Sequence, residues 1–172
     1  MVEGIAQVLT VQGMQAFVNA HEWVWPVCEM IHYVGMSLII GIIGTLDLRI
    51  LGLFKNIPIA AFRPLVPFAV AGFIGNLLTG IVFVTGTASG AIFYIDNLSF
   101  QLKLLFLVLA FANLAIFQFS GLEKAVYAIP AGGSAPTAAK AISGFSLVAW
   151  VLVIAFGRLL MYNDTLLIFL GM

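Results

Sequence analysis

Long apolar segments separated by short polar stretches dominate the chain. A helix needs about 20 mostly apolar residues to cross the hydrocarbon core of a bilayer. Four segments reach that length, at residues 27–54, 62–86, 101–121 and 141–162. The stretches at 87–100 and 122–140 contain Gly, Pro or Asn and predict loops. The pattern therefore predicts one all-α domain over residues 1–172, an integral membrane four-helix bundle.

The two ends of the chain have a different pattern. Residues 4–20 carry several amide side chains and place their apolar and polar residues on opposite helical faces. This predicts an N-terminal interfacial helix that lies along the membrane surface. Residues 165–172 form a short apolar C-terminal tail that cannot cross a bilayer, and we expect it to pack at the surface or on a partner.

Basic residues predict the orientation. Arg49, Lys55 and Arg63 flank the connection between the first two spans, and Lys124 and Lys140 flank the connection between the last two. Because Lys and Arg are enriched in cytoplasmic loops, both connections are predicted to be cytoplasmic. Both termini and the remaining connection then lie outside, on the periplasmic side in a Gram-negative cell.

Composition agrees with a bilayer environment. The 172 residues are 63% hydrophobic and 8% charged, and the mean hydropathy is +1.16, whereas soluble domains carry about 25% charged residues. The net charge is zero, so no basic patch indicates nucleic acid. The expected partners are the lipid bilayer and, because the 18.5 kDa chain has almost no water-soluble part, other membrane subunits or further copies of itself.

Four ionisable residues lie within or at the edge of the predicted spans. Glu29 and His32 share a face near the outer end of the first span, Lys103 begins the third, and Arg158 lies near the outer end of the fourth. Each charge facing lipid costs about 2.5–3.5 kcal/mol on insertion scales, so such groups usually face a protein interior. We therefore predict an outward-side polar pocket that binds an anionic or redox ligand, such as haem b or a quinone. The alternative is an internal ion-pair network without a ligand, in which Glu29 pairs with Arg158 or Lys103.

Metal binding by histidine is a narrower hypothesis. His21 and His32 are too far apart along one helix, about 16 Å, to clamp a single iron. His32 and Met161 form a possible His/Met haem pair. Cys28, His32 and Met36 lie on one helical stripe and could favour Cu(I), although such residues are more often packing residues.

Other polar residues are predicted to have structural roles. Asp47 and Arg49 lie at the cytoplasmic end of the first span, where Asp47 is expected to pair with a neighbouring cation. Asn76 and Asn113 lie near mid-membrane and are expected to form hydrogen bonds between helices.

No sequence signature of catalysis is present, since the chain lacks HExxH, Gly-x-Ser-x-Gly, Walker and CxxCH motifs. The predicted function is a non-catalytic membrane subunit that binds its ligand in electron transfer. One alternative is a structural accessory subunit of a larger membrane complex. Another is a copper or small-solute carrier.

One extended pattern resembles that of an uncharacterised bacterial family of small four-span inner-membrane proteins. The pattern consists of Trp25-Pro26-x-x-Glu29-x-x-His32, Gly35, Gly41, Asp47-Leu48-Arg49-x-Leu51-Gly52-Leu53, Phe100-x-Leu102-Lys103 and Gly157-Arg158-Leu159. The resemblance implies a location in the bacterial cytoplasmic membrane, and no activity comes with it. Family members carry a histidine near the end of the third span, where this chain has Gln118, so the resemblance implies no second haem or metal ligand there.

Overall fold

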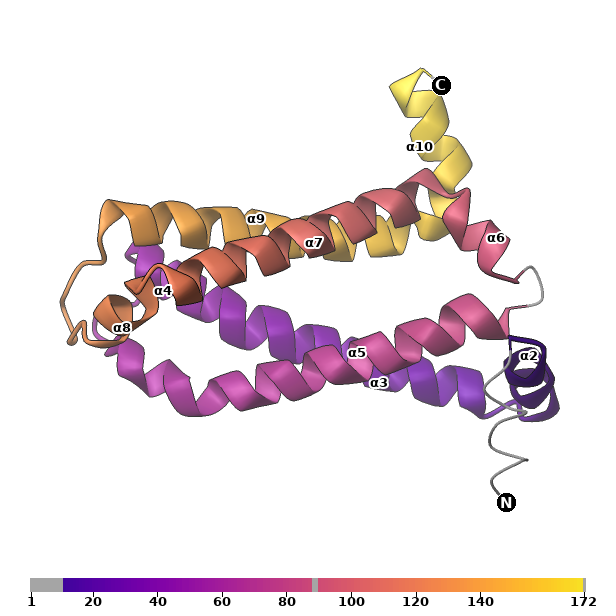
Figure 1. Cartoon of the computed structure of the whole chain (residues 1–172), viewed down its shortest axis with the longest axis horizontal. Helices are drawn as coiled ribbons and strands as arrows, with labels where there is room; N and C mark the ends of the chain where they lie inside the picture. Colours follow the sequence, from indigo (N-terminus) through magenta and orange to yellow (C-terminus); the bar gives the residue numbers. More distant parts are fainter. Residues whose placement is uncertain (1–10, 88–89, 172) are drawn as a thin grey trace.

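The computed structural model describes residues 11–87 and 90–171, and these ranges contain helices and turns without β-strands (Figure 1). Four helices are long and apolar enough to cross a membrane: Val24–Leu51, Ile59–Gly86, Leu98–Phe119 and Thr137–Tyr162. The predicted all-α membrane bundle is confirmed. The chain is a multi-pass membrane protein.

The first, second and fourth spans are not uniform α-helices. The first comprises α3 (Val24–Ile39), a π-helical turn η1 (Ile40–Gly44) and α4 (Thr45–Leu51). The second comprises a 3-10 segment η2 (Ile59–Leu65) and α5 (Val66–Gly86). The third is α7 (Leu98–Phe119), and the fourth comprises α9 (Thr137–Leu159) and the 3-10 turn η3 (Leu160–Tyr162).

The spans pack as two antiparallel pairs, α3 with α5 and α7 with α9 (Figure 1). The pairs are joined through α4, which packs against α9. At this end of the molecule lies a buried apolar cluster formed by Leu46, Ile50, Ile59, Phe62, Val126, Ala135 and Ala139. At the opposite end the ribbons of the two pairs diverge (Figure 1).

Short helices occupy both segments predicted to be loops, namely α6 (Gly90–Ile95) and α8 (Leu122–Tyr127). The third span begins at residue 98 and not at 101, because the Asn97 side chain caps it by accepting a hydrogen bond from the Phe100 amide at 3.1 Å. The first span ends at Leu51 and not at 54, because Gly52 adopts a left-handed conformation with φ of 115°.

The ends of the chain form helices too. The helix α2 (Val11–Ala20) packs against α5, and the Gln15 amide donates a 2.8 Å hydrogen bond to the Thr87 carbonyl. The remainder of the predicted interfacial helix, residues 4–10, lies outside the described residues. The C-terminal helix α10 (Asn163–Leu170) projects away from the long axis of the bundle (Figure 1).

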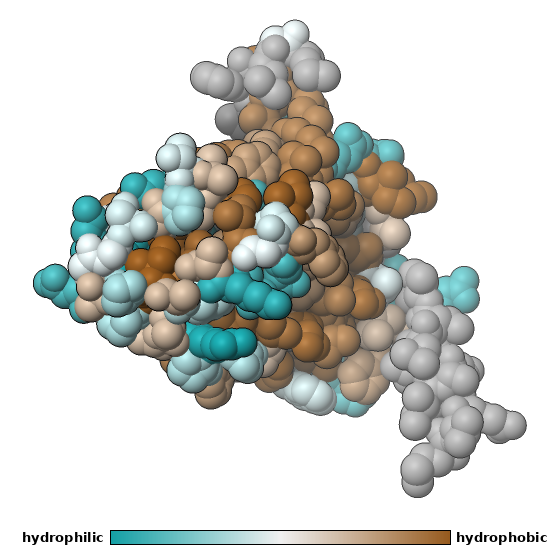
Figure 2. Space-filling view, turned by 60° about the vertical axis from the view of Figure 1, so that its left-hand side comes forward, coloured by the Kyte–Doolittle hydropathy of each residue, from teal (hydrophilic) through white to brown (hydrophobic). Residues whose placement is uncertain are grey.

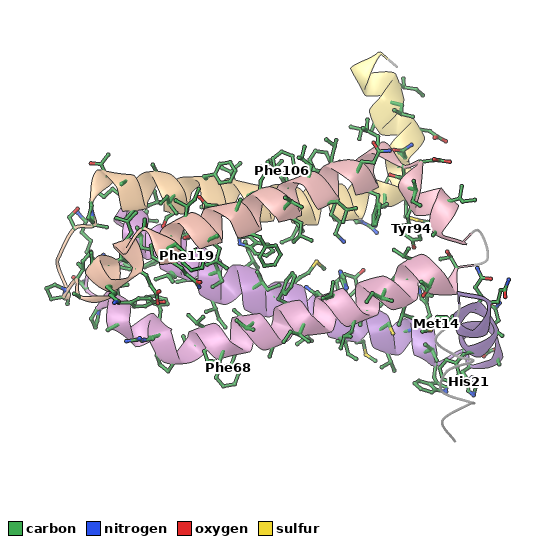
Figure 3. All side chains as sticks on the ribbon, in the orientation of Figure 1. Met14, His21, Phe68, Tyr94, Phe106 and Phe119 are labelled. Carbon is green, nitrogen blue, oxygen red and sulfur yellow. The ribbon has the colours of Figure 1, made fainter. Side chains whose placement is uncertain are left out.

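The surface matches a bilayer environment. Hydrophobic side chains cover the flanks of the bundle, whereas hydrophilic ones gather at the end that carries α8 (Figure 2). Aromatic side chains such as Phe68, which is 59% exposed, point outward from the helices (Figure 3). In water this surface would be strongly unfavourable, but acyl chains solvate it well.

Candidate functional site

His32 is held between the first two spans. Its Nδ1 lies 2.7 Å from the Thr79 hydroxyl oxygen on α5, and that hydroxyl donates its own proton to the Gly75 carbonyl at 2.8 Å. Because a hydroxyl has only one proton, Nδ1 must be the donor in its bond to Thr79. The Phe83 ring packs beside the imidazole at a centroid distance of 5.4 Å. In neutral His32 the lone pair of Nε2 is therefore available to a ligand.

Lys103 brings the second pair of helices to this site. Its ammonium group interacts electrostatically with the His32 imidazole, and its side chain lies against Gly157 of α9. A Cβ built at Gly157 would be only 3.6 Å from Nζ, so the glycine leaves room for the lysine. Within the described parts of the chain, the half-buried ammonium has no hydrogen-bond or ion-pair partner.

Glu29 and Arg158 do not form the predicted ion pair. Glu29 is exposed and accepts a hydrogen bond from Trp25 Nε1 at 3.0 Å. Arg158 is also exposed, and its guanidinium lies over the Tyr162 ring at 5.9 Å from the centroid. Long side chains at the end of a span can reach the headgroup region, so neither charge needs a partner inside the bundle. Of the four predicted site residues, the structure brings His32 and Lys103 together.

The predicted His/Met pair is not formed. Met161 is 76% exposed on η3, whereas His32 faces Thr79, Phe83 and Lys103. Among the described residues, no three His, Cys, Asp or Glu side chains converge as a metal site would require. The Cys28–His32–Met36 stripe therefore gains no carboxylate or further imidazole as a ligand.

Arg49 is completely buried and binds backbone carbonyls. Its Nε donates to the Ile57 carbonyl at 2.6 Å, and its terminal nitrogens donate to the Pro130 and Gly133 carbonyls at 3.3–3.4 Å. One guanidinium thus ties together the two connections at the α8 end. The expected pairing of Asp47 with a cation is wrong, since the polar neighbours of Asp47 are the Ser146 and Ser143 hydroxyls on α9.

The two mid-membrane asparagines join helices as predicted. Asn113 donates from Nδ2 to the Ile142 carbonyl at 3.1 Å and so links α7 to α9. The Asn76 amide, with Nδ2 directed at α3, donates to the His32 carbonyl at 2.7 Å and links α5 to α3. Both interhelical bonds are confirmed.

Sequence reasoning missed three hydroxyl residues that complete these polar contacts. Thr79 fixes the tautomer of His32, and Ser143 and Ser146 face Asp47. The two serines are separated by three positions and therefore share a helical face, which was the available signal.

Tyr127 on α8 lies outside the spans and has a perturbed phenol. Burial and the nearby Glu123 carboxylate raise the pKa of Tyr127, and the Arg63 guanidinium partly opposes them. The guanidinium lies 5.7 Å from the centroid of the Tyr127 ring. This group links α8 to η2 at the membrane boundary.

Comparison of the chain with protein-family models, curated proteins and solved structures finds no match.

Proposed function

We propose that the protein is a non-catalytic subunit of the bacterial cytoplasmic membrane that binds a redox ligand at His32 and Lys103 and takes part in electron transfer. The observation that carries the proposal is the pairing of an imidazole having an available Nε2 with an ammonium group that has no partner in the described chain. Both groups lie inside helices that cross the membrane. Buried polar groups of this kind usually mark functional positions.

A quinone suits these two groups. The Lys103 ammonium can donate a hydrogen bond to a quinone carbonyl, and the His32 Nε2 can accept one from the hydroxyl of the reduced form. The Thr79 contact holds the imidazole in the tautomer that this requires.

Haem b is the second ligand that the residues fit. A histidine that binds a metal usually donates its other ring N–H to a fixed acceptor, as His32 does to Thr79. His32 would hold the iron through Nε2, and Lys103 would face a propionate. Haem would supply one-electron chemistry.

The distribution of cations supports an orientation with both termini outside. Arg49, Lys55, Arg63, Lys124 and Lys140 belong to α4, η2, α8, the start of α9 and the turns between them, all at one end of the bundle (Figure 1). Under the positive-inside rule this end is cytoplasmic. His32 and Lys103 then lie in the outer half of the membrane.

The test is the ligand content of the detergent-purified protein. We would record its absorption spectrum for a Soret band and extract quinone from the same sample into organic solvent. His32→Gln and Lys103→Met are expected to lower the ligand content at least tenfold. The matched controls are His21→Gln, at an exposed histidine, and Lys140→Met at the other end of the bundle. Equal ligand content in His32→Gln and His21→Gln, or neither ligand in the wild type, would refute the proposal.

A structural accessory subunit is the second candidate. Only 6% of the most apolar stretch of the third span and 11% of that of the fourth are buried within the bundle. These faces are therefore available to another membrane protein. Purification in a mild detergent followed by native mass spectrometry would show a larger, ligand-free assembly if this candidate is right.

A further inference from the structure

A second polar site lies around Asp47, far along the same span from His32. Asp47 is 5% exposed and belongs to α4, which packs against α9. Its Oδ2 has no hydrogen-bond partner among the described residues. The guanidinium of Arg49, two positions away, is occupied by the carbonyls of Ile57, Pro130 and Gly133. The carboxyl group is thus buried without a protein cation beside it.

Asp47 lines a cavity of about 140 Å³ between α4, α7, α8 and α9. The polar side chains around it include Asn113, Ser143, Ser146 and Tyr127. Ser143 and Ser146 are 2% and 8% exposed. Asn113 uses Nδ2 to bind the Ile142 carbonyl, which leaves its Oδ1 as an acceptor. A cavity of this size has room for several water molecules or for a partly hydrated ion.

The available donor atoms are oxygens, and their charge is low. One carboxylate faces two hydroxyls and one amide, so the inner group carries a single negative charge. Glu123 and Tyr127 of α8 are the other titratable residues that line the cavity. Hard cations prefer such oxygen ligands. One negative charge is balanced by a monovalent cation, whereas a divalent ion would leave an excess positive charge in the membrane.

We propose that this cavity binds a small monovalent cation, with Na⁺ as the probe, through the oxygens of Asp47, Ser143, Ser146 and Asn113. Waters within the cavity complete the coordination shell. The π-helical turn Ile40–Gly44 ends three residues before Asp47, and π-helical turns are frequent at functional sites. This turn shifts the helical register, and Asp47 beyond it faces α9. The site is separate from the His32–Lys103 site and does not depend on the function proposed above.

The experiment measures thermal unfolding of the purified full-length protein in detergent as NaCl replaces choline chloride at constant ionic strength. Bound ligand stabilises the folded state by mass action, so the Tm should rise by about 5–10 °C at a Na⁺ concentration 100 times the Kd. Asp47→Asn should abolish the rise. Ser146→Ala, which keeps the carboxyl group, should shift the midpoint to at least threefold higher Na⁺. Asp96→Asn is the matched control, because Asp96 is an exposed aspartate in the turn before α7.

Three outcomes would overturn the proposal. The first is the same Tm in NaCl and choline chloride for the wild type. The second is the same Na⁺ response in wild type, Asp47→Asn and Ser146→Ala. The third is a protonated Asp47 that persists at saturating Na⁺, seen as a carboxylic acid C=O band in the infrared spectrum of the wild type and absent from Asp47→Asn. If Asp47→Asn does not fold, Ser146→Ala and the infrared band still decide the question. Parallel titrations with KCl and CaCl₂ test the choice of ion, and a Tm response to Ca²⁺ alone would also contradict it.

Discussion

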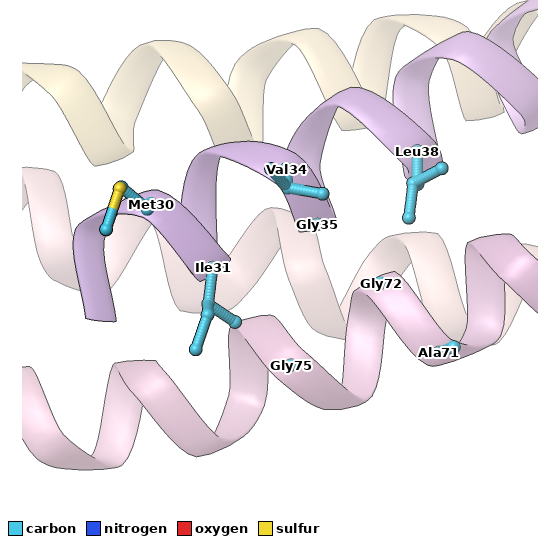
Figure 4. A pocket seen from close by; sticks show the side chains of 8 residues that line it. All are labelled: Met30, Ile31, Val34, Gly35, Leu38, Ala71, Gly72 and Gly75. Carbon is cyan, nitrogen blue, oxygen red and sulfur yellow. The ribbon is translucent and has the colours of Figure 1, made fainter. Parts of the chain in front are cut away.

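Gly35 of α3 and Gly72 of α5 meet so closely that a Cβ on Gly35 would lie 2.5 Å from the Gly72 carbonyl oxygen. A Cβ on Gly72 would in turn lie 2.9 Å from the Gly35 carbonyl oxygen. Real Cβ atoms do not approach backbone oxygens at such distances. This crossing therefore fixes the spacing of the first two spans and, with it, the contact of His32 with Thr79. The glycines also line an apolar groove between the helices (Figure 4).

Substituting Gly35 by alanine should push α3 and α5 apart. Overpacking of this kind usually costs about 1–3 kcal/mol, and the unfolding free energy of Gly35→Ala should fall by that amount in an SDS titration followed by tryptophan fluorescence. Gly41→Ala is the control, because a Cβ at Gly41 has nothing within 4 Å. That variant should be neutral or more stable by up to about 1 kcal/mol. Equal stability of the two variants would show that the crossing tolerates a methyl group.

Arg49 should be indispensable to the end of the bundle that carries α8. Arg49→Met leaves three backbone carbonyls without their donor, and each buried unsatisfied group costs about 1–3 kcal/mol. We expect a loss of about 3 kcal/mol or more in the unfolding free energy, together with faster hydrogen exchange at Gly132, whose amide donates to the Lys55 carbonyl at 2.7 Å. Lys55→Met, at an exposed position of the same region, should change stability by less than about 0.5 kcal/mol.

Thr79 should act on the ligand site through His32. In Thr79→Val the Nδ1–H loses its acceptor, and loss of such an orienting partner typically lowers metal affinity or activity about 10–100-fold. The ligand content of the purified variant should fall accordingly. The ¹⁵N shifts of the His32 ring should show a mixture of tautomers, which is a readout that does not require a bound ligand. Thr85→Val is the control, because the Thr85 hydroxyl binds only the Ile81 carbonyl of its own helix. If both variants keep the His32 shifts and ligand content of the wild type, Thr79 does not position the imidazole.

Tyr127 should make stability fall at high pH. Its pKa is raised in the folded state by burial and by Glu123, so the folded protein holds the phenolic proton more tightly than the unfolded chain does. The stabilisation is fully present below the unfolded pKa of about 10. It is lost as the pH rises from there through the folded pKa. Difference spectra of tyrosinate absorbance between wild type and Tyr127→Phe should show this delayed titration. Glu123→Gln should lower the pKa and Arg63→Gln should raise it; the reverse order would contradict the assignment.

The sequence was informative about individual helices and less so about their neighbours. Asn76 and Asn113 were correctly predicted to bind across helices, because an amide near the middle of a bilayer has few other partners. Asp47 and Arg49 were both assigned to one inner polar group, yet they have separate partners. Residues two apart on a helix point to nearly opposite sides, so nearness in sequence does not place them in one contact.

The outer residues show the same division. Glu29, His32, Lys103 and Arg158 were placed at similar depth by counting residues, and a count gives no rotation about the helix axis. The structure turns His32 toward Lys103 and leaves Glu29 and Arg158 exposed. It also shows helix-capping by Asn97, which moved the start of the third span by three residues from the predicted position.

By itself, the amino-acid sequence determined that this is an all-α protein with four membrane-spanning helices, because insertion depends on the summed hydrophobicity of each segment and needs no knowledge of the others. The tertiary structure alone decided that His32 meets Thr79 and Lys103, that Arg49 binds two loops, and that Asp47 faces Ser143 and Ser146. These contacts depend on how each helix is rotated and crossed, and that geometry is fixed by close approaches such as Gly35–Gly72 and by the π-helical turn before Asp47.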